Sequence, residues 1–302
     1  MSGVSASMPP PAQWPALVPA PQSVTWRRAS DARMCLAAGY ALLLQVSHPT
    51  VGAGVSEHSQ FQRDPWGRLL RTLDYTYTLV YGGPQAAGEM GRRLRAFHRH
   101  IRGVDRHGRR YRALEPDAYA WVHATLAESI VRAHERFGVA FSPPQREELW
   151  TQWRALGRLL GIRAGDLPRD WSGFQAYVQD MGEHTLRRTD AVDEVLGALA
   201  RPAAPPAPAI ATPLWTLARL PLGHLLELAT VGLLAPALRR RLGLRWSRAL
   251  ELQLRAAEVA LRSATPLMPD WLQNTSAGYL RHRGPALART RAAAAAAARV
   301  AR

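Results

Sequence analysis

The sequence predicts an all-α protein that folds as a single multi-helix globular domain. Apolar residues recur at helical spacing along most of the chain, and no stretch shows the strict alternation of a half-buried strand. Helix-start signals, such as Asp64 followed by Pro65 and Ser142 followed by Pro143, precede several of these stretches. The chain has 302 residues and is 47% hydrophobic, which is enough to build a sizeable core.

Composition excludes several classes of protein. The chain contains no lysine, so it cannot form a Schiff base or build a P-loop. Its single cysteine, Cys35, cannot form an intrachain disulfide, a zinc cage or a Cys-x-x-Cys-His haem attachment. The net charge of +16 comes entirely from arginine in a chain rich in alanine and proline, a bias typical of GC-rich coding. Because no basic stripe interleaves with aromatic residues, we expect no nucleic-acid partner.

Both ends of the chain have biased compositions. Residues 1–23 are rich in proline, alanine and serine, with neither a positively charged start nor a continuous apolar segment. We expect a disordered leader rather than a signal peptide or a membrane span, and therefore a cytoplasmic protein. Residues 286–302 form a tail of alanine and arginine.

An Ala/Pro-rich stretch, residues 201–213, is the one internal boundary that the sequence suggests. It separates residues 24–200 from residues 214–285, whose helices we expect to pack on the same core. Residues 220–238 are apolar but contain His224 and Glu227. A buried or interfacial helix fits this stretch better than a membrane span and allows peripheral contact with a membrane.

The first long helix is predicted to begin near Ser30 or Asp31 and to be apolar nearly all round, which indicates burial. It should end at His48, because Pro49 disfavours helical geometry at the residue before it. His48 is either a histidine that closes a buried helix or a ligand of a bound group. A loop with two glycines is expected from residue 50 to residue 61.

The next helix carries two arginines and a hydroxyl close together. Arg68 and Thr72 are four residues apart and share one face, and Arg71 is three residues from Arg68. This set could hold the carboxylates of a bound cofactor, or it could be a solvated basic face.

A third helix, after Gly82, carries His98 and His100 on either side of its apolar stripe. Helical periodicity barely separates the two as candidate ligands, and a histidine that only packs in the core is the alternative for each. His123 and His134 lie on the following helix, where packing or surface exposure is the favoured interpretation.

Several of these blocks, in order and spacing, resemble a known family between about Trp26 and Leu199. They are LLLQVSHPTVGAGVSEHSQF, the run of Arg68, Arg71 and Thr72, then FHRHIRG with Tyr111, and WVHATL from Trp121. The family is the haem-dependent oxygenase catalytic domain shared by bacterial latex-clearing proteins (rubber oxygenases) and the fungal oxygenase of mycophenolic acid biosynthesis.

The resemblance implies a haem b protein in which His98 is the proximal ligand of the iron. It places Arg68 and Thr72 beside the haem, with Arg71 where rubber oxygenases have lysine. These three would bind the propionates or polarise bound oxygen in catalysis, and His48 would be a distal catalytic group or one that supports the groups in contact with the haem. Glu57 is the nearest candidate for the carboxylate base of that family. The implied function is an oxygenase that uses dioxygen on an apolar, isoprenoid- or polyketide-like small molecule. A haem-binding sensor or carrier without turnover, and a cofactor-free helical binding protein, are the alternatives.

Overall fold

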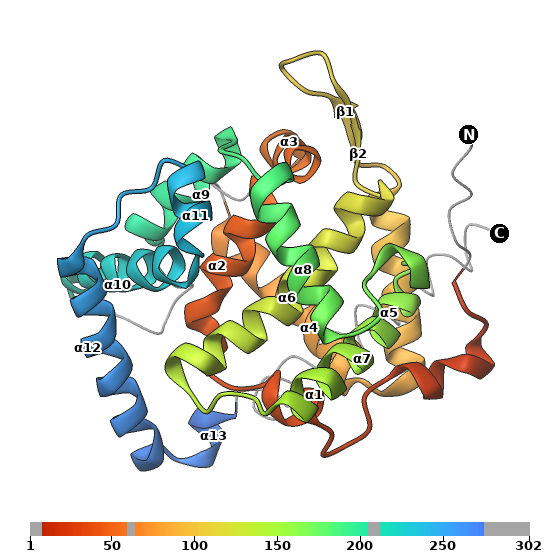
Figure 1. The fold of residues 1–302 in the computed structure, drawn as a ribbon, viewed down its shortest axis with the longest axis horizontal. Helices are drawn as coiled ribbons and strands as arrows, with labels where there is room; N and C mark the ends of the chain where they lie inside the picture. Colours follow the sequence, from red (N-terminus) through yellow and green to blue (C-terminus); the bar gives the residue numbers. More distant parts are fainter. Residues whose placement is uncertain (1–7, 59–63, 205–211, 275–302) are drawn as a thin grey trace.

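The computed structural model describes residues 8–58, 64–204 and 212–274, and this part of the chain is almost entirely helical (Figure 1). The first half contains a 3-10 helix, Pro11–Leu17, and then α1 Val24–Arg28, α2 Met34–Ser47, α3 Pro49–His58, α4 Pro65–Tyr81, α5 Gly83–His98, α6 Pro116–Phe137 and α7 Pro143–Leu159. The second half contains α8 Trp171–Asp180, a π-helical turn Met181–Thr185, α9 Asp190–Ala200, α10 Thr212–Leu233, α11 Pro236–Arg241, α12 Arg248–Ala264 and α13 Asp270–Gln273, with short 3-10 turns at Ala164–Asp166 and Thr265–Leu267. The predicted all-α fold is confirmed.

Helix α2 lies at the centre and contacts α3, α6, α9 and α10. Its apolar residues point to all sides, and Leu43 and Leu44 are fully buried, as expected for a helix with no polar face. The long helix α6 packs along it, and the indole Nε1 of Trp121 donates to the backbone carbonyl of Leu44 at 3.0 Å. This bond gives a buried donor its partner and fixes the two helices against each other.

Helices α4 and α5 form an antiparallel pair joined at Gly82 and Gly83. The carboxylate of Asp64 accepts from the backbone N–H of Gly67 at 2.8 Å and so caps α4, with Pro65 at the first helical position. Gly83 has a φ of +76°, a conformation that favours glycine and lets the chain reverse. The reversal returns the end of α5 to the level of the start of α4.

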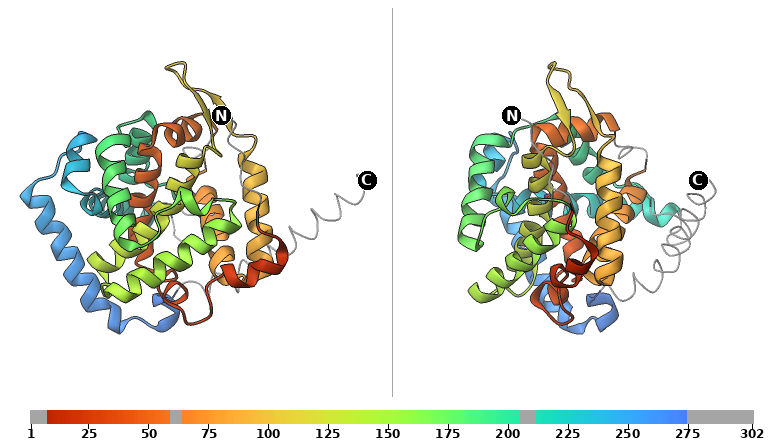
Figure 2. Two further views of the ribbon diagram at one scale, coloured as in Figure 1. Left: turned by 45° about the vertical axis from the view of Figure 1, so that its right-hand side comes forward. Right: turned by 90° about the vertical axis from the view of Figure 1, so that its right-hand side faces the viewer.

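Three segments differ from the sequence-based expectation. The stretch expected as a loop from residue 50 is the helix α3, and residues 59–61 lie outside the described part. The polar stretch after residue 102 forms a two-stranded antiparallel hairpin, β1 Arg102–Val104 and β2 Arg110–Arg112, that stands out from the helical body (Figures 1 and 2). Residues 8–23, expected as part of a disordered leader, pack against α5 and α7.

The physical reason for this last difference is Trp14, which is 2% exposed. Its ring lies directly on Gly88 of α5, its Nε1 donates to the carbonyl of Pro9 at 3.0 Å, and the guanidinium of Arg92 lies 4.7 Å from the ring centroid. Burial of one large aromatic side chain is enough to order a short segment that is otherwise rich in proline.

The chain beyond the Ala/Pro-rich stretch packs on the same core as the chain before it. Leu228 and Leu233 of α10 and Leu254 of α12 belong to one cluster with Leu43 of α2 and Val192 of α9. Residues 205–211 of the stretch, and residues 275–302, which include the predicted tail, lie outside the described residues. Within the described ranges, no single helix is long and apolar enough to cross a membrane, although α2 and α3 together meet that test as a pair bent by 105°.

Replacement of Trp14 by alanine should lower the free energy of unfolding by roughly 3–5 kcal/mol, the usual cost of removing a buried aromatic side chain. The neighbouring change Gln13→Ala, at an exposed position, should have little effect. Chemical denaturation of both variants measures the difference. Equal stability of the two would mean that residues 8–23 are not part of the folded core.

Candidate active site

His98 is the last residue of α5 and lies half-buried beside the first turn of α6. Its ring packs edge-on against Tyr119, with the ring centroids 5.6 Å apart. Its Nδ1 is 2.7 Å from the backbone carbonyl of Leu94, one turn earlier. Because a carbonyl oxygen only accepts hydrogen bonds, Nδ1 carries the proton and Nε2 keeps its lone pair.

The surroundings of His98 keep it neutral and leave Nε2 available. Burial lowers the pKa of its imidazole, and the bond to the Leu94 carbonyl only partly opposes this effect. No hydrogen-bond partner for Nε2 is present within the described ranges. His100, in contrast, is exposed in the turn that follows the helix. The structure thus separates two histidines that helical periodicity does not.

Arg68 lies in the first turn of α4, fourteen residues before Gly82, and His98 ends α5, fifteen residues after Gly83. Its side chain is half-buried, and its pKa is lowered first by burial and second by repulsion from Arg71. Arg71 is exposed and is 3.2 Å from the carboxylate of Asp64. The hydroxyl of Thr72 is also exposed and donates to the backbone carbonyl of Arg68 at 3.0 Å. Of the three residues expected beside a cofactor, the structure turns Arg68 inward and leaves the other two on the open side of α4.

His48 joins α2 to α3 and is 2% exposed. Neither of its ring nitrogens has a hydrogen-bond partner within the described part of the chain. Its Nε2 is 3.7 Å from an Oδ atom of Asp117 in the first turn of α6, which is beyond hydrogen-bond distance. The interaction with His48 is nevertheless the largest cause that lowers the pKa of the Asp117 carboxyl.

The first turn of α6 connects the two histidines. Asp117 faces His48, and Tyr119, two residues later, packs on His98. Both histidines therefore lie against the start of α6, while Arg68 comes from the first turn of α4. A buried imidazole without a partner, a second imidazole with a free nitrogen and a half-buried guanidinium are the groups expected around a bound anionic cofactor.

A second cluster, not assembled by the sequence analysis, involves Tyr111, Glu57 and His58. The hydroxyl of Tyr111 is 2.5 Å from a carboxylate oxygen of Glu57 and 2.9 Å from Nε2 of His58. Burial first, and Glu57 second, raise the pKa of Tyr111. The sequence predicts a loop after Pro49, so it gives no reason to expect Glu57 and His58 together at the end of a helix. Glu57, the candidate base, is thus held by a tyrosine at the base of the hairpin.

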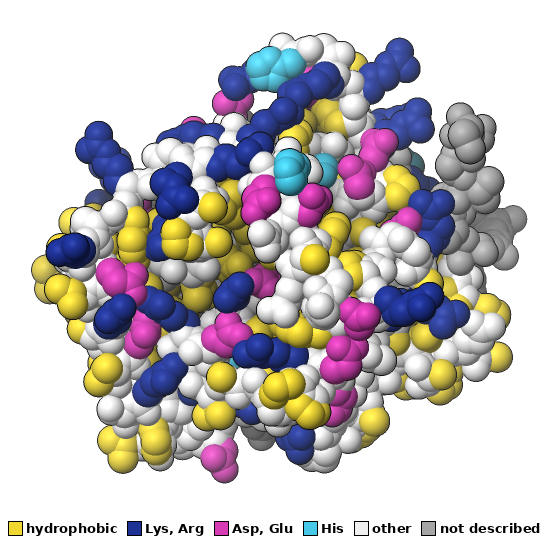
Figure 3. Space-filling model, in the orientation of Figure 1, with side chains coloured by type: hydrophobic (Ala, Val, Ile, Leu, Met, Phe, Trp, Pro, Cys, Tyr) yellow, Lys and Arg dark blue, Asp and Glu magenta, His cyan; other side chains and the backbone are white. Residues whose placement is uncertain are grey.

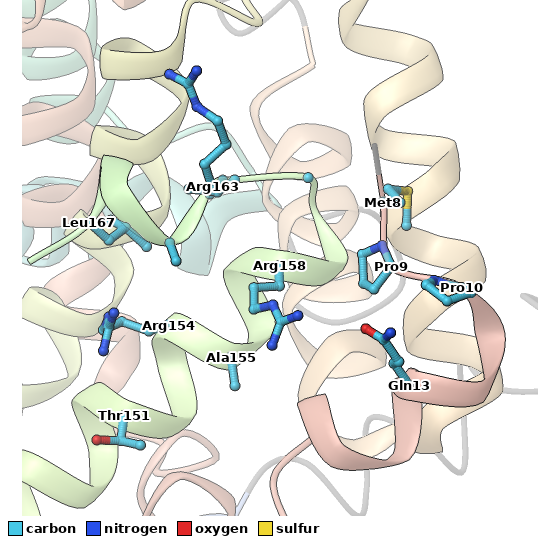
Figure 4. A pocket seen from close by; sticks show the side chains of 13 residues that line it. Met8, Pro9, Pro10, Gln13, Thr151, Arg154, Ala155, Arg158, Arg163 and Leu167 are labelled. Carbon is cyan, nitrogen blue, oxygen red and sulfur yellow. The ribbon is translucent and has the colours of Figure 1, made fainter. Parts of the chain in front are cut away.

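A cavity of about 610 Å³ lies elsewhere, between residues 8–13 and α7 with the loop that follows it (Figure 4). It is lined by apolar residues and by Arg154, Arg158 and Arg163. Its lining includes neither histidine described above, so it does not belong to this site.

Comparison with known proteins decides the family. Residues 26–263 match the family described as ER-bound oxygenase mpaB/B'/rubber oxygenase, catalytic domain. The chain belongs to this family. An uncharacterized protein of Mycobacterium bovis and an uncharacterized protein of Mycobacterium tuberculosis are each 26% identical to it over 232 residues, which cover 76% of this chain and 87% of theirs. No solved structure matches it significantly.

The match extends past the region that carried the resemblance, through α10 and α11 and to the penultimate residue of α12. This agrees with a core shared by the two parts of the chain. The chain therefore carries an oxygenase catalytic domain, and an oxygenase is an oxidoreductase.

The buried imidazole of His48, which has no hydrogen-bond partner within the described residues, leads to a stability prediction for this oxygenase domain. In cofactor-free protein, His48→Leu should leave the free energy of unfolding unchanged or raise it, because it removes two buried nitrogens without partners. The matched change His123→Leu should lower that free energy by roughly 1–3 kcal/mol, because the Nε2 of His123 is bonded to the carbonyl of Trp153 at 2.7 Å.

Thermal and chemical denaturation of the two variants measure this contrast. If His48→Leu lowers the free energy of unfolding as much as His123→Leu does, then His48 has a structural role and its ring nitrogens are not a ligand site.

Proposed function

We propose that this chain is a haem b-dependent oxygenase in which His98 is the axial ligand of the iron. The proposal rests on the hydrogen bonding of its imidazole ring. Nδ1 donates to the Leu94 carbonyl, the ring is neutral because burial lowers its pKa, and Nε2 has a lone pair available for a metal. Ligating histidines typically have this arrangement, because the second hydrogen bond fixes the tautomer and orients the ring. Membership of an oxygenase family supplies the reaction class.

The other residues fit the remaining needs of a haem. Arg68 is half-buried on α4, the helix paired with α5, and its guanidinium can pair with a propionate carboxylate. Arg71 and Thr72 lie on the exposed side of the same helix. To bind a propionate, Arg71 would have to give up its ion pair with Asp64. That ion pair is exposed and contributes little to stability. Bound haem would supply the binding and activation of dioxygen.

The protein's own contribution is positioning and proton control. His48 is buried, next to the exposed Asp117, and can donate a hydrogen bond from whichever ring nitrogen carries the proton. A donor of this kind, already oriented in a site that excludes water, stabilises developing negative charge on oxygen. Asp117 remains ionised at neutral pH because its pKa is lowered, so its carboxylate faces Nε2 of His48 as an anion.

For the substrate we propose an apolar small molecule, isoprenoid- or polyketide-like. The support is the family description, which names a rubber oxygenase, a protein whose substrate is an apolar polymer. We also retain the cytoplasm as the proposed location. Consumption of dioxygen with such a substrate separates an oxygenase from a haem-binding sensor or carrier.

His98→Ala should abolish or shift the Soret band of protein reconstituted with haem, because alanine cannot coordinate iron. His100→Ala, at an exposed position two residues later, should leave the spectrum nearly unchanged. Far-ultraviolet circular dichroism of both variants checks that the helical content is intact. A reversed pattern would make His100 the ligand, and an unchanged spectrum in both variants would exclude His98.

Arg68→Ala should weaken haem binding about tenfold or more, the usual effect of removing one charge-assisted hydrogen bond. Arg99→Ala is the control, because Arg99 is exposed and lies just beyond the end of α5. Titration of each cofactor-free variant with haem measures the affinities, and substrate oxidation should follow the same order. Equal affinities and equal rates for the two variants would remove Arg68 from the site.

A further inference from the structure

The β1–β2 hairpin carries a dense set of arginines on a part of the protein that projects from the helical body. Between residues 102 and 112 there are five arginines and a histidine, against one aspartate. Figure 3 shows basic and histidine side chains gathered at the top of the molecule, where Figure 1 places the hairpin. Tyr111 of this hairpin holds Glu57, but the proposed oxygenase chemistry uses none of the hairpin's arginines.

The register of the hairpin concentrates this charge on one face. Arg102 is directly opposite Arg112, and Val104 is directly opposite Arg110. Side chains alternate along a strand, so these four point to the same side, and all four are exposed. We call this set the outward face. Like charges directly across a two-stranded ribbon are unfavourable, so folding stability does not account for the Arg102–Arg112 pair.

The opposite face of the hairpin is fixed to the body of the protein. Tyr111 is 3% exposed, and its hydroxyl bonds to Glu57 and His58 at the end of α3. Across from it, Gly103 leaves no room for a side chain, since a Cβ there would lie 2.5 Å from the Tyr111 hydroxyl. The hairpin is therefore held with its arginine face toward solvent.

Of the carboxylates close to the hairpin, Glu57 accepts from Tyr111, and two others pair with arginines outside the outward face. Arg109 pairs with Asp105 at 2.8 Å, and Arg106 pairs with Asp190 at 2.7 Å. Within the described ranges, no carboxylate lies at ion-pair distance from Arg102, Arg110 or Arg112. Arg187 lies nearby, and its pKa is lowered by burial first and then by repulsion from Arg109. Asp105 and Asp190 thus offset Arg109 and Arg106, whereas the three arginines of the outward face have no paired carboxylate within the described ranges.

From this geometry we propose that the outward face is a docking surface for an anionic lipid bilayer. Arginine near a membrane surface gains attraction from anionic head groups, and a side chain such as Val104, 55% exposed among arginines, can enter the head-group region. Nucleic acid is the weaker candidate, because the outward face has no aromatic residue to stack on a base and presents an exposed valine instead. The proposal does not depend on haem binding or on turnover.

Vesicle sedimentation tests the proposal with the full-length protein at low ionic strength. The probes are vesicles of phosphatidylcholine alone and vesicles in which roughly three lipids in ten are phosphatidylglycerol. The protein should bind the anionic vesicles, bind the neutral vesicles much less, and be released by salt. Equal binding to both kinds of vesicle would overturn the proposal.

The variant R102Q/R110Q/R112Q should bind anionic vesicles on the order of a hundredfold more weakly, since each arginine at such a surface contributes about fivefold. The matched control R240Q/R245Q/R248Q removes the same charge from exposed positions on α11, α12 and the turn between them. It should change binding by only a few fold. If the control loses as much as the hairpin variant, net charge and not the hairpin explains the attraction.

Val104→Ser keeps the arginines and the net charge and removes the apolar contact, and it should also weaken binding to anionic vesicles. Fluorescence anisotropy with a short DNA duplex is measured in parallel on the same variants. Loss of duplex binding in the hairpin variant, with vesicle binding unchanged, would assign the surface to nucleic acid and overturn the membrane proposal. Circular dichroism confirms that the variants remain folded.

Discussion

Helix α2 has no polar face, and the rest of the structure depends on covering it. An apolar helix of this kind is stable in water only when other elements surround it. Here α6, α9 and α10 contact it, so segments separated by more than 150 residues share one core. The same requirement sets the position of the candidate site, because His48 caps the end of α2, and α6, the helix packed along it, has Asp117 and Tyr119 in its first turn.

Much of this arrangement could be predicted from the sequence. Asp64 with Pro65, Ser142 with Pro143, and Ser247 all cap helices where the sequence indicates a start, since each side chain accepts from a backbone N–H of the first turn. The end of α2 was also predicted correctly. His48 has φ −72° and ψ 126°, the extended geometry that a following proline imposes.

The same proline caused the main error. Pro49 ends one helix and also occupies the first position of the next, where its fixed φ is favourable. Of the two glycines that indicated a loop, Gly52 serves packing instead: a side chain there would meet the carbonyl of Val46 and the side chain of Thr189. Such a contact with α9 is a tertiary feature that local sequence does not encode. The hairpin was missed for a related reason, because its strands are only three residues long and half of their residues are arginine.

For the site, the sequence supplied candidates but not their surroundings. Helical periodicity placed His98 and His100 almost equally close to the apolar stripe of α5. What distinguishes them is that α5 ends at His98 and that Tyr119, twenty-one residues later, packs on its ring. Likewise, the sequence grouped Arg68, Arg71 and Thr72. In the structure only Arg68 is half-buried, and the hydroxyl of Thr72 donates to a backbone carbonyl of its own helix. The contrast between these residues follows from packing across the α4–α5 pair.

The central claim is that this oxygenase domain holds one haem through a histidine. Titration of the purified, cofactor-free protein with haem b, followed by the absorption spectrum of the reduced form, tests that claim most directly. The structure predicts saturation at one haem per chain with the spectrum of a histidine-ligated ferrous haem. A protein that remains colourless after the titration, or that takes up haem without saturation and with the spectrum of free haem, would contradict it.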